Sequence, residues 1–169
     1  MTLFEAALGY ARRGWPVFPC HPGTKRPLTP KGVGGTGGLK HATTDEGVIT
    51  KWWQRFPKAM IGVPTGRPLG AFVIDVDAGI DAETGEVFEA DAIIAALEAE
   101  LGVILPSTWA AATPRGGRHL YFKLPAGVAI RNRTGIVPRV DARGDGGYVV
   151  VPPSARSDGK AYCWVVAPW

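Results

Sequence analysis

The sequence predicts an α+β (mixed α/β) fold in which helices pack on a mixed or antiparallel sheet. The 169 residues are 46% hydrophobic and 20% charged, the balance of a globular domain with a packed core. Helical signals occur in three segments, whereas short runs with strand character fill the last third of the chain. The 23 glycines and 15 prolines indicate many loops between these elements.

Capping residues and helical spacing define the helices. Thr2 and Glu5 form a capping box, and Thr44 or Asp45 caps a second helix. Apolar residues at helical spacing mark a third helix after an acidic loop over residues 78–88. The expected helices cover residues 3–13, about 45–56 and 89–101.

Strands are expected where short apolar runs lie between turn residues. A Gly- and Pro-rich loop over residues 20–43 separates the first strand from the second helix. We find no internal repeat and no long linker, so a single domain over residues 1–169 is expected. The expected strands are WPVFP (15–19), MIGVP (60–64), AFVIDVD (71–77), STWAAAT (107–113), HLYFKL (119–124), RVDAR (139–143), GYVVVPP (147–153) and AYCWVV (161–166).

Several classes of protein are disfavoured by the composition. The longest apolar run, Leu69–Ile74, is far shorter than the ~20 residues that span a bilayer. The N-terminus carries an acid before its basic pair, the reverse of a signal peptide, so a cytoplasmic protein is expected. Cys20 and Cys163 are too few for a disulfide framework, and even with the three histidines no zinc site is expected. Any metal would therefore be held by carboxylates.

The charge is distributed in three blocks. Residues 1–60 carry a net charge of +6, residues 61–108 carry −8, and residues 109–169 carry +6. This pattern is compatible with an ordinary solvated surface. It is also compatible with a polyanion-binding surface around a cation-binding centre.

Carboxylates stand on two of the expected strands. Asp75 and Asp77 share one face of AFVIDVD, ~7 Å apart along the strand, where they can bridge divalent cations. Aspartate is depleted in strands and a buried charge needs a partner, although an exposed edge or a strand end would also explain the pair. Asp141 and Arg143 share one face of RVDAR.

A third motif, TPRGGRHLYF, combines a glycine turn with a histidine. Gly116 and Gly117 form a tight turn whose amides can face an anion. His119 lies beside Arg115 and Arg118 and is placed to donate to phosphate oxygens, although a satisfied histidine in a hairpin is the simpler reading of this motif alone. Alternation puts His119, Tyr121 and Lys123 on one face and Leu120, Phe122 and Leu124 on the core face. Together, the three motifs suit two Mg²⁺ or Mn²⁺ ions and a triphosphate.

These motifs, with GWPVFP, KRPL, HATTD, WWQRFP and IGVPTG, closely resemble one family. It is the N-terminal domain of bifunctional DNA primase/polymerases, the prim-pol domain of the archaeo-eukaryotic primase superfamily. The family occurs in plasmid, phage and prophage replication proteins. The resemblance covers nearly the whole chain, in the expected order.

The resemblance implies a compact fold with an RRM-like sheet that carries the catalytic acids. It implies a template-dependent nucleotidyltransferase that adds dNTPs or NTPs to a 3′-hydroxyl. Asp75, Asp77 and Asp141 match the carboxylates that hold two Mg²⁺ or Mn²⁺ ions. His119 matches the catalytic-site histidine that contacts the incoming triphosphate.

Further nucleotide contacts are expected around these groups. Arg118 and the Gly116–Gly117 turn would lie against the same phosphates, and Arg143 is adjacent by strand parity. Lys25, in the Gly/Pro loop, is our candidate for another phosphate or template contact. The helical pair Trp52 and Trp53 could stack on bases, but a place in the core is favoured.

The expected partners are a single-stranded DNA template, a primer and nucleotides, bound by a monomer without contact to a membrane. Relatives continue into a helical domain and often a helicase, so this chain is expected to be the N-terminal part of a longer replication protein. Two alternatives use the same residues. One is a metal-dependent nuclease, and the other is a non-catalytic module for single-strand binding or origin recognition.

Overall fold

The computed structural model describes residues 1–30 and 37–169. Residues 31–36, part of the predicted loop over residues 20–43, lie outside the described residues. Over the described residues, three α-helices accompany sheets of three, six and two strands, and every pairing between named strands is antiparallel. The predicted α+β class is therefore confirmed.

The helices and strands follow one another in the order expected for the most part. The helices are α1 (Leu3–Arg12), α2 (Glu46–Arg55) and α3 (Ala90–Leu101), with one 3₁₀ turn, η2 (Gly38–His41). The strands are β1 (Phe18–Cys20), β2 (Met60–Pro64), β3 (Ala71–Val76), β4 (Gly79–Ile80), β5 (Val87–Phe88), β6 (Trp109–Ala112), β7 (Arg118–Lys123), β8 (Arg133–Val137), β9 (Val140–Arg143), β10 (Tyr148–Val150) and β11 (Cys163–Val166).

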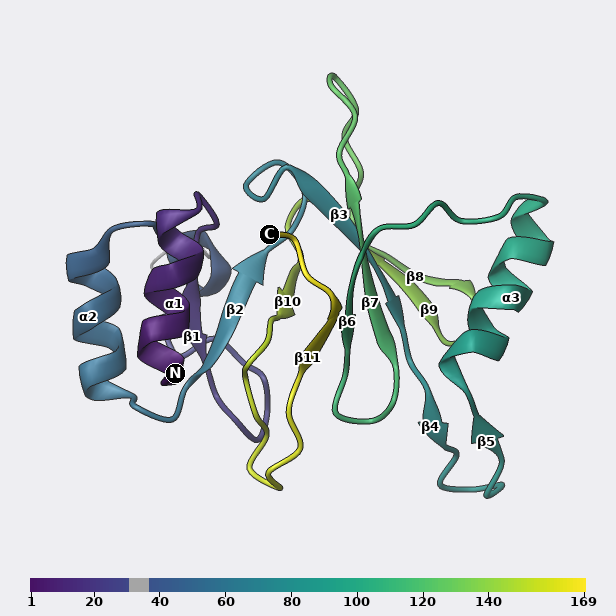
Figure 1. The fold of residues 1–169 in the computed structure, drawn as a ribbon, viewed down its shortest axis with the longest axis horizontal. Helices are drawn as coiled ribbons and strands as arrows, with labels where there is room; N and C mark the ends of the chain where they lie inside the picture. Colours follow the sequence, from purple (N-terminus) through teal and green to yellow (C-terminus); the bar gives the residue numbers. More distant parts are fainter. Residues whose placement is uncertain (31–36) are drawn as a thin grey trace.

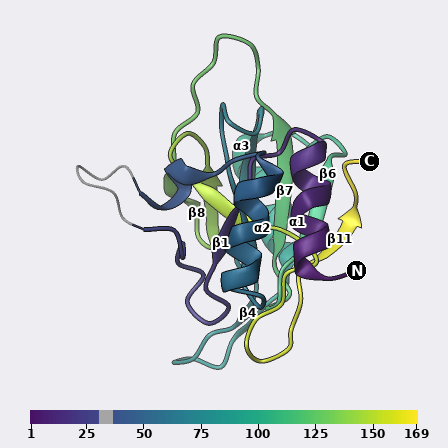
Figure 2. The same cartoon turned by 90° about the vertical axis from the view of Figure 1, so that its left-hand side faces the viewer.

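The elements form four layers, shown from one side to the other in Figure 1. Helices α1 and α2 lie side by side on the outside, as the view in Figure 2 shows, and cover the sheet β1-β2-β10. The six-stranded sheet, in the order β11-β6-β7-β3-β9-β8, follows, and α3 covers its far side. None of the helices described is long and apolar enough to cross a membrane.

Of three apolar clusters of buried residues, two pack helices on the sheets, one of them large and the other smaller. The larger one joins α1 and α2 to both sheets, through side chains such as Ile49, Ile61 and Val73. It includes Trp53, which is 2% exposed, so its predicted place in the core is confirmed. The smaller cluster packs Ile93 and the rest of the inner face of α3 against the far side of the large sheet.

Local signals begin the first two helices as expected. The capping box of α1 is complete, since the Thr2 hydroxyl accepts from the Glu5 amide and Glu5 accepts from the Thr2 amide. Asp45, rather than Thr44, caps α2: its Oδ1 accepts from the amide of Val48 at 2.9 Å. The capping residues therefore fix where both helices start.

The predicted order of elements needs three corrections. The first strand begins at Phe18 rather than at residue 15. The predicted acidic loop over residues 78–88 contains the two-stranded hairpin β4–β5. Strand β8 was not predicted, because its segment RTGIV carries no alternating apolar pattern and is ordered by pairing with β9.

The predicted core face of β7 is also wrong. His119 and Tyr121 are 5% and 1% exposed, whereas Leu120 and Phe122 are only half-buried. The reason is tertiary: the small sheet and the loops beside it cover the His119 face, while α3 covers the opposite face only in part. Asp75, Asp141 and His119 therefore lie between two layers of the molecule rather than on its outside.

Candidate active site

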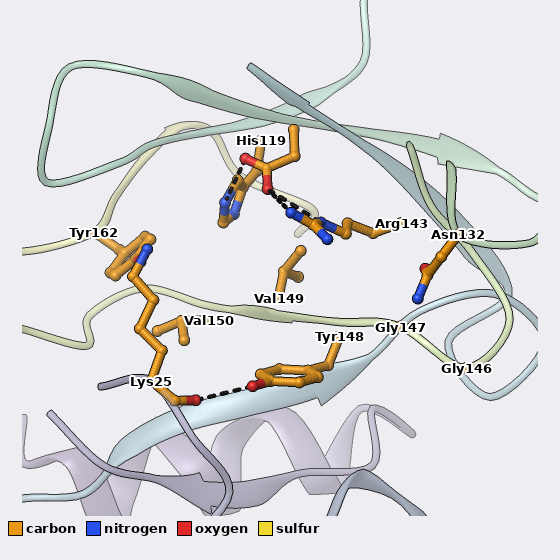
Figure 3. Close-up of a pocket in the computed structure, with 11 residues that line it drawn as sticks. Lys25, His119, Asn132, Arg143, Gly146, Gly147, Tyr148, Val149, Val150 and Tyr162 are labelled. Atoms are coloured by element: carbon orange, nitrogen blue, oxygen red, sulfur yellow. Dashed lines mark hydrogen bonds and ion pairs between the residues drawn. The ribbon is translucent and has the colours of Figure 1, made fainter. Parts of the chain in front are cut away.

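A polar pocket of about 250 Å³ opens between the two sheets (Figure 3). The large sheet contributes one wall through β3, β7 and β9, and β10 of the small sheet contributes the opposite wall. The pocket is lined by Lys25, Asp75, His119, Asn132, Arg143, Gly146, Gly147, Tyr148, Val149, Val150 and Tyr162.

The register of the large sheet brings three predicted site residues into one row. Strand β3 runs between β7 and β9, and Asp75 pairs with His119 on one side and with Asp141 on the other. Directly opposed residues on one sheet face have neighbouring side chains. The sheet therefore aligns two acids and the histidine that lie 66 residues apart at most.

Asp75 is the electrostatic centre of this row. Its Oδ1 lies 3.4 Å from His119 Nε2, and its Oδ2 accepts from Arg143 Nε at 3.2 Å and Nη2 at 3.1 Å. Burial disfavours the charged form, but His119 and Arg143 outweigh it and lower the pKa of Asp75 to about 2. Asp75 is therefore a carboxylate at neutral pH.

Asp141 is held on both of its oxygens. Its Oδ2 accepts from Arg143 Nη2 at 2.9 Å, and its Oδ1 accepts from the amide of Gly135 on β8 at 2.9 Å. Its side chain is 20% exposed. One guanidinium thus connects the acids of β3 and β9.

Asp77 lies just beyond the end of β3 and is exposed. Its amide donates to the carbonyl of Arg139 at 2.9 Å, which anchors the backbone there. Partial burial of its carboxyl and the charge of Asp75 raise the pKa of Asp77. Asp77 therefore lies close enough to Asp75 to be affected by its charge, but it does not line the pocket.

Lys25 reaches the pocket from the loop that follows β1. Its backbone is left-handed (φ 61°), and its carbonyl accepts from the Tyr148 hydroxyl at 3.1 Å (Figure 3). Its Nζ lies 5.8 Å from the centre of the Tyr162 ring. Partial burial lowers the pKa of Lys25, and the charges of Asp75 and Asp77 oppose that shift.

The glycine turn is not part of the pocket lining. The Gly116 amide donates to the carbonyl of Thr113 at 3.0 Å, so it is used inside the turn. Arg118 donates back to the carbonyls of Gly116 and Gly117, and it precedes His119 on a strand whose faces alternate. The structure therefore brings together Lys25, Asp75, His119, Asp141 and Arg143, but leaves Arg118, Gly116 and Gly117 outside.

Three pocket residues with polar side chains were not predicted. Tyr148 and Tyr162 stood inside predicted strands, and their aromatic character alone gave no sign of a site. Tyr162 is 1% exposed, and its ring centre lies 5.7 Å from that of His119. Asn132 lies in a stretch without a predicted element, and its Oδ1 accepts from the Gly144 amide at 3.0 Å.

An antiparallel sheet that presents paired acids, a histidine and cations to one pocket is suited to chemistry on phosphates. The sequence matches, over residues 7–168, the family described as bifunctional DNA primase/polymerase, N-terminal (Prim-Pol). The chain therefore belongs to the Prim-Pol family, and membership implies DNA primase/polymerase activity with DNA and nucleotides as substrates. No curated protein matches the sequence.

Polymerases of this family are typically metal-dependent. Within residues 1–30 and 37–169, no three His, Cys, Asp or Glu side chains are gathered as a ready-made metal cluster. Two carboxylates nevertheless converge on one point, because Oδ2 of Asp75 and Oδ2 of Asp141 both contact Arg143 Nη2. Carboxylate oxygens are the donors that Mg²⁺ and Mn²⁺ prefer, so these residues fit a divalent cation.

Proposed function

We propose that this protein is a template-dependent nucleotidyltransferase that extends a 3′-hydroxyl on single-stranded DNA with dNTPs or NTPs and releases pyrophosphate. Residues 1–169 act as one catalytic domain, a monomer, at the N-terminal end of a longer replication protein of a plasmid, phage or prophage. A C-terminal helical and helicase region would complete that protein. The observation that carries the proposal is the row of Asp75, His119 and Asp141 across three paired strands.

Asp75 and Asp141, with Asp77 at the end of β3, would hold two Mg²⁺ or Mn²⁺ ions. When bound, such ions lower the pKa of the attacking hydroxyl and neutralise charge on the triphosphate. The low pKa of Asp75 keeps this ligand ionised throughout the physiological range. Asp75 thus needs no proton removed before it binds a cation.

His119, Lys25 and Arg143 would bind the phosphate oxygens. All three face the pocket, from β7, from the loop after β1 and from β9 (Figure 3). The volume of about 250 Å³ is below the ~300–1,000 Å³ of pockets that enclose a whole small molecule. The pocket therefore suits the triphosphate, with the base outside it against the template.

The reaction needs positioning more than proton transfer by side chains. The 3′-oxygen forms a bond to the α-phosphorus, the bond from that phosphorus to the bridging oxygen breaks, and pyrophosphate leaves. Lys25 and Arg143 stabilise the charge that develops on the leaving group, and His119 donates to a phosphate oxygen. The hydroxyl proton passes to solvent.

Primer extension on a single-stranded template, with Mg²⁺ or Mn²⁺ and either dNTPs or NTPs, tests the proposal. Asp75→Asn and Asp141→Asn should each lower the rate by more than the ~10–100-fold typical of groups that only support a metal ligand. Glu100→Gln removes an exposed acid at the end of α3 and should leave the rate unchanged. Circular dichroism checks that each variant is folded.

Two outcomes would contradict this function. Cleavage of the strand without nucleotide incorporation would indicate a metal-dependent nuclease that uses the same acids. Template binding that is unchanged or stronger in Asp75→Asn and Asp141→Asn, with no incorporation by the wild type, would indicate a non-catalytic single-strand or origin-binding module.

A further inference from the structure

We infer that Arg143 is a positioning residue that occupies the place of a divalent cation between Asp75 and Asp141, and leaves that place when a metal binds. Its guanidinium forms ion pairs with Asp75 at 3.1 Å and with Asp141 at 2.9 Å, both through the same nitrogen, Nη2. This inference rests on the proposed function, in which the two carboxylates bind metal.

The sheet itself dictates this placement. Asp75 pairs with Asp141, and Val73, two residues earlier on β3, pairs with Arg143, two residues later on β9. The Arg143 side chain is therefore on the same sheet face as both acids. It follows Asp141 as the next side chain on that face of β9, and it is diagonal to Asp75. A long side chain at this position reaches the gap between the two carboxylates without any change in the backbone.

The gap needs a positive charge. The Asp75 and Asp141 side chains are 14% and 20% exposed, so their mutual repulsion is screened only weakly by water. Opposed like charges on neighbouring strands destabilise a sheet. Arg143 supplies the compensating charge and keeps the carboxylates in the orientation that they need as ligands.

Arg143 and a metal ion cannot both occupy this point. An ion bound to Oδ2 of both acids would stand where Nη2 now stands, because both oxygens already face that nitrogen. The Arg143 side chain is 30% exposed and lines the pocket, so it has room to turn toward the space that we assign to the triphosphate. Its charge would then face the phosphates from the side opposite to Lys25 (Figure 3).

Binding of Mn²⁺ without nucleotide, followed by the electron paramagnetic resonance signal of the free ion, tests the inference. Arg143→Gln removes the competing charge and should tighten Mn²⁺ binding about tenfold, the effect of one charge-assisted contact. Arg143→Lys keeps the charge but loses the forked contact, and should bind with an affinity between the two. Lys25→Gln removes a charge of the same pocket that forms no bridge, and should change the affinity by less than about threefold.

Thermal unfolding gives a second readout. Arg143→Gln should melt at a lower temperature than the wild type in EDTA, and Mn²⁺ should raise its melting temperature by more than it raises that of the wild type. If Arg143→Gln does not fold, the Mn²⁺ affinity of Arg143→Lys tests the inference instead. An affinity higher than that of the wild type supports the inference, and an equal affinity overturns it.

The remaining outcomes separate this inference from the proposed function. Mn²⁺ binding by Arg143→Gln that is unchanged or weaker, or an equal gain in Lys25→Gln, would show that Arg143 does not hold the place of the ion. Wild-type protein that binds no Mn²⁺, or binds it as tightly in Asp75→Asn, would instead refute the metal site of the proposed function.

Discussion

Gly117 offers a sharp test of how closely the backbone around the acids is packed. A methyl group at this position would collide with the carbonyl oxygen of Val76 and would lie 3.2 Å from the amide of Ala78. Val76 lies between Asp75 and Asp77, so the atoms in the way belong to the segment that carries both acids. Gly117→Ala should therefore act on the site as well as on stability.

The size of the effect follows from the distances. To reach an ordinary contact, the Val76 carbonyl or the turn must recede by about 1 Å, and a displacement of that size at catalytic groups can cost ~100-fold in rate. Overpacking adds a loss of roughly 1–3 kcal/mol in the free energy of unfolding. In a domain of this length, each 1 kcal/mol lowers the melting temperature by about 2–4 °C.

Gly116→Ala is the matched control. Gly116 has φ +89°, and a methyl group there would meet nothing within 4 Å, so the cost is backbone strain of roughly 1–2 kcal/mol without displacement of β3. Thermal melts should show a lower melting temperature for both variants. Primer extension at a temperature where both are folded should show a large loss of rate for Gly117→Ala only. Gly117→Ala with wild-type rate and melting temperature would refute the reasoning.

Two further predictions concern the core. Trp53→Ala should lower the free energy of unfolding, measured by urea titration, by about 3–5 kcal/mol, because the ring is buried and its Nε1 donates to the Ala59 carbonyl. Trp52 is only partly buried, so Trp52→Ala should lower the free energy of unfolding by less, and it should leave template affinity unchanged. Burial raises the pKa of the Cys20 thiol to about 12, whereas Cys163 is exposed. Iodoacetamide at pH 8 should therefore alkylate Cys163 first, which mass spectrometry detects. Equal rates of alkylation would contradict the buried position of Cys20.

The elements predicted best are those whose signals are local. Helix α1 has its complete capping box, and β2 and β3 occur almost where the apolar runs placed them. The hairpin β4–β5 was missed because its strands have two residues each and are joined by an acidic turn. Such short strands exist through their pairing, which no single segment reveals.

The face of β7 shows a limit of polarity patterns. Leu120 and Phe122 are the more apolar set, so a one-sided sheet would bury them and expose His119. In the structure both faces are covered to some degree, and the more complete cover lies over His119. The polar residue on the His119 face thus lines a pocket inside the molecule and is not exposed to bulk water.

The candidate site was predicted in chemistry more than in geometry. Asp75, His119 and Asp141 were chosen from separate motifs, and only the register shows that they are opposed on adjacent strands. Arg118 was expected to accompany His119, but consecutive residues of a strand point to opposite faces, a rule that argued against this pairing from the start. The roles of all these residues stay predictions.

The segment that follows Asp141 explains how the pocket acquires two walls. Within four residues, Gly144–Gly147, the chain passes from β9 of the large sheet to β10 of the small sheet. Hydrogen bonds hold this turn in place, since the Thr65 hydroxyl donates to the Gly144 carbonyl at 2.7 Å and Asp145 accepts from the Arg67 amide at 2.8 Å. A methyl group at Gly144 would collide with the carbonyl of Ile130, so a larger residue would displace this turn or the segment at Ile130. The glycines of this motif thus contribute to the site by geometry, because they let the chain turn from one wall of the pocket to the other, and Gly146 and Gly147 also line that pocket.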